Sequence, residues 1–206
     1  LQLDIGAPQQ FMDFQFRLDS PEYGEFWLAH CGALMDVEPF GEASVKLMCH
    51  DIEDPTFDAT AAATHPCMKM RPIHRPPRTP ADRHPHCRWK VFIGDEAEPY
   101  EQHPNLERVR ASKAACLPIE VPGNDGEPGG WPDYSGPFDP DFQLEDLSHR
   151  ALVGVNREIA LQSHLLARSL LLAVSQRLDT AAATELAEAQ WTGTAALTAE
   201  RIREPM

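Results

Sequence analysis

Residues 67–74 read CMKMRPIH and residues 86–93 read HCRWKVFI, and these two stretches decide the fold. In both, apolar side chains alternate with basic ones, which is the two-residue period of a strand with one buried face. The proline-rich segment 75–85 between them favours an irregular connection. The pattern predicts an antiparallel hairpin whose Lys and Arg side chains project from one face.

The sequence before this hairpin carries further strand signals. Residues 1–18 alternate loosely around three phenylalanines and predict a strand. Residues 23–34 fit either a strand or a short helix, and Gly32 indicates that an element ends at Cys31. Residues 43–52 mix residue types in a way that favours a helix.

The C-terminal third has helical periodicity instead. From Leu144 to Val174, apolar residues recur every three or four positions, which predicts a helix of about thirty residues. Glu145 and Asp146 would then lie in the first turn, where negative charge is favourable. A second helix is predicted over residues 181–203, with Asp179 or Thr180 as its N-cap.

Together these patterns predict an α+β protein, in which an antiparallel, strand-rich part bearing the cysteines and histidines precedes a helical hairpin. Composition suggests three segments. They are a strand-rich domain over residues 1–122, a Pro/Gly-rich linker or draped loop over residues 123–143, and the helical hairpin over residues 144–206.

The formal net charge of −14 argues against nucleic acid as a partner. Residues 1–60 carry twelve acidic and two basic side chains, whereas residues 61–94 carry one acidic and seven basic. This basic island either neutralises its acidic neighbours through ion pairs or forms a site for a small carboxylate or phosphate. No stretch is apolar enough to span a membrane, so no membrane partner is expected.

Cysteine and histidine are concentrated in one region. Of the fourteen such residues, twelve lie between His30 and Cys116. Thiolate and imidazole serve both metal binding and nucleophilic catalysis. Three interpretations stay open: the residues are structural, or they hold a metal ion, or one thiol is a nucleophile. In the last case, a neighbouring imidazole and the basic hairpin would lower the pKa of that thiol.

Two sets of residues carry these chemical interpretations. The catalytic candidates are Cys31, Cys49, Cys87, His30 and Asp51. The candidate ligands of a divalent transition metal, zinc or iron, are His50, His65, Cys67 and His86. Asp51 shares a face with Glu53 if the chain is extended and with Asp54 if it is helical, and either pair would orient a histidine.

A polar stripe also interrupts the apolar surface of the first long helix. It consists of Glu158, Gln162 and Arg168, with His164 beside them. Such a stripe either lines a pocket or satisfies itself through contacts between residues four apart.

Four short motifs resemble the family of L-2-amino-thiazoline-4-carboxylic acid hydrolase-like proteins, over about residues 20–95. They are His30-Cys31-Gly32, Cys49-His50-Asp51, Pro55-Thr56-Phe57 and His86-Cys87-Arg88-Trp89-Lys90. The resemblance implies hydrolysis of a carbon–nitrogen bond in a small carboxylate-bearing ring. Arg71 or Arg88 would then bind the substrate carboxylate.

The predicted function is therefore a small-molecule hydrolase with a Cys/His site. A metal- or small-ligand-binding module and an accessory subunit of a larger bacterial enzyme are the alternatives. Five cysteines without a pairing pattern fit reduced thiols, so we expect a cytoplasmic protein. The wide apolar surface of the first long helix needs a cover, which predicts a homo-oligomer through the C-terminal helices or a hetero-subunit.

Overall fold

The structure is a computed structural model that describes residues 11–97, 100–119, 129–133, 137–139 and 141–203. The chain divides into two compact units. The first comprises residues 1–101 and 133–147, and the second comprises residues 102–132 and 148–206.

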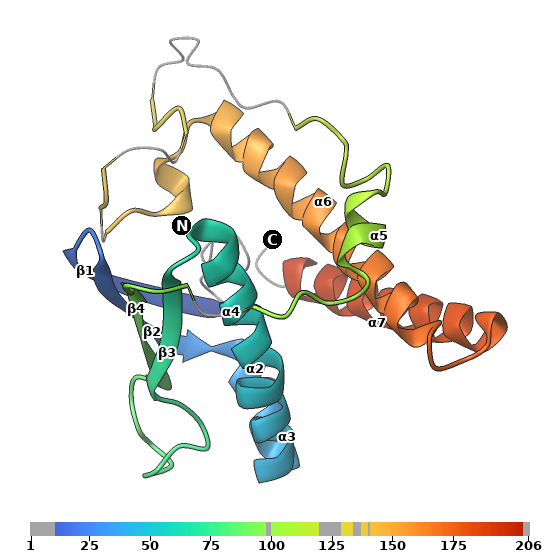
Figure 1. The fold of residues 1–206 in the computed structure, drawn as a ribbon, viewed down its shortest axis with the longest axis horizontal. Helices are drawn as coiled ribbons and strands as arrows, with labels where there is room; N and C mark the ends of the chain where they lie inside the picture. Colours follow the sequence, from blue (N-terminus) through green and yellow to red (C-terminus); the bar gives the residue numbers. More distant parts are fainter. Residues whose placement is uncertain (1–10, 98–99, 120–128, 134–136, 140, 204–206) are drawn as a thin grey trace. The chain divides into compact units, whose positions relative to one another are not determined.

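A four-stranded antiparallel sheet forms the centre of the first unit (Figure 1). In spatial order its strands are β1 (Met12–Ser20), β2 (Tyr23–Cys31), β4 (Cys87–Ile93) and β3 (Met68–His74). The predicted hairpin is confirmed as β3 and β4, in which Arg71 lies opposite Lys90. Pro72 is tolerated because β3 is an edge strand. The predicted first strand is confirmed from Met12 onward, and its residues 1–10 lie outside the described part of the chain.

Short helical elements follow β2 in the chain. They are α2 (Gly32–Val37), the 3₁₀ turn η1 (Glu38–Phe40), α3 (Glu42–Lys46), the π-helical turn η2 (Leu47–Ile52) and α4 (Glu53–Thr64). α3 and η2 confirm the helix predicted over residues 43–52. β2 ends at Cys31, as Gly32 indicated, and the Cys31 Sγ accepts a hydrogen bond of 3.4 Å from the Leu34 N–H. A side chain at position 32 would collide with Phe11, since a Cβ there would lie 2.3 Å from its ring.

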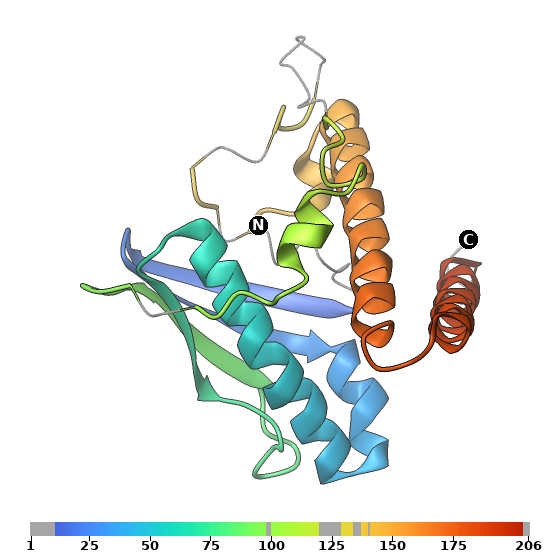
Figure 2. The same ribbon diagram turned by 45° about the vertical axis from the view of Figure 1, so that its right-hand side comes forward.

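An aromatic cluster joins α4 to one face of the sheet, along which Figures 1 and 2 both show α4 running. The ring of Phe57, on α4, lies 4.6 Å from the ring of Trp89, on β4. Phe26, on β2, stacks parallel to Trp89, and both side chains are only 1% exposed. Burial of these large rings provides the main apolar contact between helix and sheet.

The sequence analysis did not predict α4. The segment from Asp51 to Asp54 was left open as extended or helical, and the structure shows that it is helical. Pro55 lies in the first turn of α4, where the missing N–H of proline is tolerated. Glu53 and Asp54 occupy the same turn, where acidic side chains are favourable.

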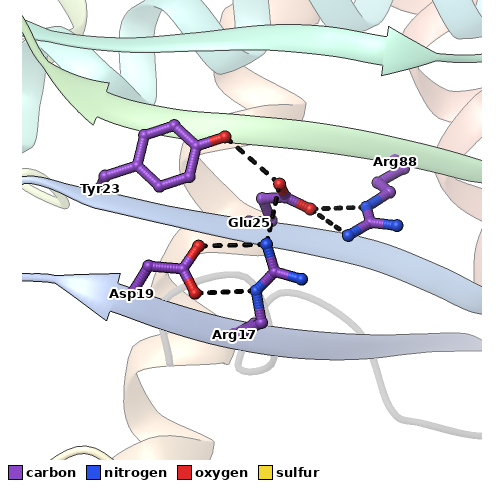
Figure 3. A network of polar contacts seen from close by, with 5 residues as sticks. All are labelled: Arg17, Asp19, Tyr23, Glu25 and Arg88. Carbon is purple, nitrogen blue, oxygen red and sulfur yellow. Dashed lines mark hydrogen bonds and ion pairs between the residues drawn. The ribbon is translucent and has the colours of Figure 1, made fainter.

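The opposite face of the sheet carries a polar network centred on Glu25 (Figure 3). The Glu25 carboxylate, 9% exposed, accepts hydrogen bonds from Arg17 on β1 and Arg88 on β4, and from the Tyr23 hydroxyl on its own strand. Arg17 also pairs with Asp19. Because its partners come from three adjacent strands, the Glu25 carboxylate ties β1, β2 and β4 together.

The second unit is helical. Its helices are α5 (Leu106–Arg110), α6 (His149–Val174) and α7 (Thr180–Arg203). α6 starts later than predicted: Ser148 is its N-cap, and Glu145 and Asp146 belong to the separate turn η3 (Leu144–Asp146). The N-cap predicted for the second helix is confirmed, because Asp179 Oδ1 accepts a hydrogen bond of 3.0 Å from the Ala182 N–H.

α6 and α7 contact each other, which confirms the helical hairpin and the α+β class. Within the described residues, no helix combines the length and the apolar character needed to cross a membrane.

We predict that Phe57→Ala lowers the free energy of unfolding by about 3–5 kcal/mol, because it leaves a cavity beside Trp89. Phe40→Ala is the matched control. Phe40 is 78% exposed, so its loss should change stability by less than about 0.5 kcal/mol. Urea unfolding followed by tryptophan fluorescence measures both values. Equal effects of the two substitutions would contradict the assigned packing of α4.

Candidate active site in the first unit

Three cysteines from separate elements meet in the core of the first unit. Cys31 ends β2, Cys49 lies in η2, and Cys87 begins β4. None of the three is more than 4% exposed, and all belong to the cluster that contains Phe57 and Trp89. These are the three thiols that the sequence analysis selected as catalytic candidates, and the structure brings them together.

Glu53 is the carboxyl group of this cluster. Cys49, Glu53, Phe57 and Ala61 follow one another at four-residue spacing, so they share one helical face. Cys49, Phe57 and Ala61 are buried against the sheet. Glu53 therefore stands in an otherwise apolar stripe, and its Oε2 is buried with no hydrogen-bond partner among the described residues. Such an atom is uncommon in native proteins, and a catalytic role is one explanation for it.

Burial dominates the protonation of this carboxyl. The pKa of Glu53 is raised to about 7, chiefly by desolvation; the charge of Arg75 lowers it in part, and the Asp54 carboxylate adds a smaller increase. A carboxyl that titrates near neutral pH can both give and take a proton under physiological conditions.

Burial also raises the pKa of all three thiols, and the charge of Glu53 adds to the effect in each case. The pKa of Cys49 rises to about 12. Cys31 raises the pKa of both Cys49 and Cys87, in keeping with their shared place in the core. The nucleophile interpretation expects a lowered thiol pKa, and the structure gives the opposite direction. At neutral pH the resting cluster therefore holds protonated thiols.

Arg75 is the cation of the cluster. Its guanidinium pairs with Asp54, lies 3.5 Å from the carbonyl oxygen of Cys49, and sits 5.7 Å from the centre of the Trp89 ring. Its charge lowers the pKa of both Glu53 and Cys49. Arg75 thus favours the ionised forms that burial disfavours.

The histidines next to these cysteines in the chain point elsewhere. Successive side chains of a strand project from opposite faces, so His30 is exposed whereas Cys31 is buried. The rings of His30 and His84 lie 6.4 and 4.9 Å from the ring of His86. Burial, followed by the charge of Arg78, lowers the pKa of His86. No imidazole in the described part of the chain is hydrogen-bonded to a thiol, so the predicted Cys–His pairs do not form.

The predicted metal ligands do not form a group either. His50 Nε2 donates to the carbonyl oxygen of Pro76 at 2.7 Å, and His65 Nδ1 accepts from the N–H of Cys67 at 3.1 Å. Across residues 11–97 and the other described ranges, no three His, Cys, Asp or Glu side chains are placed to share a metal ion. The zinc or iron site stays a prediction.

Asp51, the remaining catalytic candidate, is an exposed residue of η2. The arginines proposed to bind a substrate carboxylate already have carboxylate partners. Arg71 donates to Asp58 at 2.8 Å, and Arg88 pairs with Glu25. To bind a substrate, either arginine would have to exchange its partner.

Ion pairs account for most of the basic island. Four of the five arginines between residues 61 and 94 pair with acidic residues from positions 25 to 58. The pairs are Arg71–Asp58, Arg75–Asp54, Arg78–Glu38 and Arg88–Glu25. Of the two interpretations of this island, the structure supports mutual neutralisation.

Sequence reasoning gave Glu53 only a supporting role and did not select Arg75. The signal for Glu53 was present in the four-residue spacing from Cys49 to Ala61, which places one carboxyl in an apolar stripe. Arg75 had no comparable signal, because its position depends on the path of the segment between β3 and β4.

Comparisons of this chain with protein-family models, with curated proteins and with solved structures found no match. The resemblance over residues 20–95 therefore stays a prediction, and the site itself supports the functional proposal.

We predict that Glu53 makes the protein less stable as the pH rises. Its carboxyl titrates near 4.5 in the unfolded chain and near 7 in the folded unit, so the folded state holds the proton more tightly. Stability is therefore greatest below about pH 4.5 and is lost as the pH rises through about 7, by about 2–3 kcal/mol. Glu53→Gln should remove this loss.

The measurement is the free energy of urea unfolding of both proteins at pH 5 and pH 8. Other groups also titrate in this range: burial lowers the pKa of His74 and His86, which acts in the opposite direction. Their contributions are common to both proteins and cancel in the difference. If stability changes with pH by the same amount in the wild type and in Glu53→Gln, the raised pKa of Glu53 is disproved.

Proposed function

We propose that the first unit is a hydrolase that cleaves a carbon–nitrogen bond of a small carboxylate-bearing molecule. Glu53 is the acid–base group, and Cys49 is the nucleophile. The observation that carries this proposal is the buried Glu53 carboxyl, whose pKa of about 7 and unpartnered Oε2 occur beside three thiols.

Cys49 is the thiol best suited to act with Glu53. It lies one helical turn before Glu53, so the two side chains are neighbours on one face. Cys31 has a capping role, because its sulfur accepts the Leu34 N–H. Cys87 lies in a central strand of the sheet. Cys49 is carried by a π-helical turn, an irregularity that is frequent at functional sites.

The chemistry balances with these two groups and one water molecule. With an amide as the reacting group, the Glu53 carboxylate takes the proton of the Cys49 thiol as the sulfur attacks the carbonyl carbon of the carbon–nitrogen bond. The nitrogen then leaves as an amine with the proton returned by Glu53, and a thioester remains. Glu53 next takes a proton from water, whose oxygen attacks the thioester and releases the carboxylic acid, and the proton restores the thiol.

The raised thiol pKa sets a limit on this mechanism. The gap between the pKa values of Cys49 and Glu53, about 12 and about 7, corresponds to about 7 kcal/mol for complete proton transfer before attack. A turnover of about 10 per second has a total barrier of about 16 kcal/mol, so this cost is affordable. Concerted proton transfer and attack lowers the cost further, and Arg75 favours the developing thiolate.

A substrate must also reach the thiols, which the core buries almost completely. We propose that η2 moves to admit it, because this turn carries Cys49 and lies at the surface, with Leu47 56% exposed.

The same burial favours a second candidate function, which is binding of a small ligand without turnover. All five cysteines are free thiols, which supports a cytoplasmic setting for either function.

We predict that the protein releases an amine or ammonia from at least one member of a panel of small carboxylates bearing amide, amidine or thiazoline groups. Cys49→Ala should abolish the release, and Glu53→Gln should slow it by about 10²- to 10⁴-fold, because each removes a group that reacts directly. NMR spectroscopy of the reaction mixtures measures the amine and the acid together.

Cys116→Ala and Glu42→Gln are the matched controls, because both side chains are exposed and lie outside the cluster; they should leave the rate within about twofold. Full activity in a folded Cys49→Ala variant would rule out the assigned nucleophile. A panel that binds but is never cleaved would favour the ligand-binding function.

A further inference from the structure

The second unit contains a pocket that the proposed chemistry does not use. Its volume is about 800 Å³, within the usual range for small-molecule sites. Its walls come from the residues after α5, from α6 and from α7. The side chains that decide its chemistry are Lys113, His164, Arg168, Leu171, Glu188 and Trp191.

The cations of this pocket differ from those of the basic island. Lys113 and Arg168 have no acidic partner within the described residues, whereas four arginines of the first unit are paired. His164 lies one helical turn before Arg168 on α6, which adds a third basic side chain. Glu188 is the one acidic residue among those that line the pocket. The pocket therefore favours an anion.

Its apolar wall is exposed. Trp191 is 47% exposed and Leu171 is 38% exposed, and four alanines also line the pocket. Large apolar side chains left open beside unpaired cations typically mark a binding surface. A ligand that covers the ring of Trp191 would recover the free energy of burying it.

We propose that this pocket binds a small amphipathic carboxylate, with its acyl or aromatic body on Trp191 and Leu171 and its carboxylate at Arg168 and Lys113. Arginine and lysine differ in how they bind a carboxylate: the arginine fork can donate two parallel hydrogen bonds, and the lysine adds a point charge. The site is independent of the thiol cluster, so either proposal can fail alone.

The test is isothermal titration calorimetry of the full chain with decanoate as the probe. We expect one molecule of decanoate per chain and binding that weakens with salt. Arg168→Gln and Trp191→Ala should each weaken decanoate binding about tenfold. The first removes a cation that binds the carboxylate, and the second removes the ring that covers the apolar chain. Arg177→Gln is the matched control: Arg177 is an exposed cation just after the same helix and does not line the pocket, so its loss should change affinity less than twofold.

Decanol and decylamine separate charge from chain length. Both should bind at least tenfold more weakly than decanoate. Equal affinity for decanol would overturn the assigned role of the cations, and undiminished binding by Arg168→Gln would overturn the assigned position. A second copy of the chain is the competing occupant. A stable dimer in sedimentation analysis that excludes decanoate would replace the ligand proposal with a homo-oligomer through the C-terminal helices.

Discussion

The packing of Phe57 against Trp89 determines where the groups of the proposed active site lie in the first unit. This contact holds α4 on the sheet, and the helical repeat then places Glu53 one turn earlier on the same face. Glu53 is half-buried as a residue, but its Oε2 atom is buried among the apolar side chains of this face. The raised pKa of its carboxyl is therefore a consequence of apolar packing, and the nearest cation only moderates it.

Electrostatics divides the first unit into a neutralised exterior and an uncompensated interior. Outside, arginines of residues 61–94 meet carboxylates from earlier in the chain, as at Arg78 and Glu38, where two hydrogen bonds of 3.0 and 2.7 Å form. Inside, Arg75 is the cation that acts on Glu53 and Cys49, and its charge is shared with Asp54. Ion pairs of the first kind contribute little to stability. A carboxyl such as that of Glu53, whose charge is only partly balanced by a cation, lowers the stability of the fold. Functional sites commonly keep such destabilising groups.

The sequence predicted what depends on local periodicity. The β3–β4 hairpin, the end of β2 at Cys31 and the helical hairpin follow from side-chain alternation, from one glycine and from the helical repeat. Prediction from the sequence failed where local signals conflict with the tertiary packing. Pro55 gave no helical signal, so α4 was not predicted. The apolar and acidic residues of the η3 turn have the pattern of a helix start, so α6 was predicted to begin too early.

The site was predicted in part. Cys31, Cys49 and Cys87 were selected from their clustering in the chain and lie together in the core. Their pairing with histidines was not realised, because strand alternation at His30 and Cys31 separates the two side chains. Sequence distance alone cannot show that burial would raise the thiol pKa values, since desolvation depends on the completed core.

The most direct test of this account is the titration of the Glu53 carboxyl carbon, observed by NMR spectroscopy with ¹³C-labelled glutamate and assigned by its absence in Glu53→Gln. The account predicts a midpoint near pH 7 in the folded protein. A midpoint near pH 4.5 would show that the carboxyl is hydrated and would remove the basis of the proposed active site.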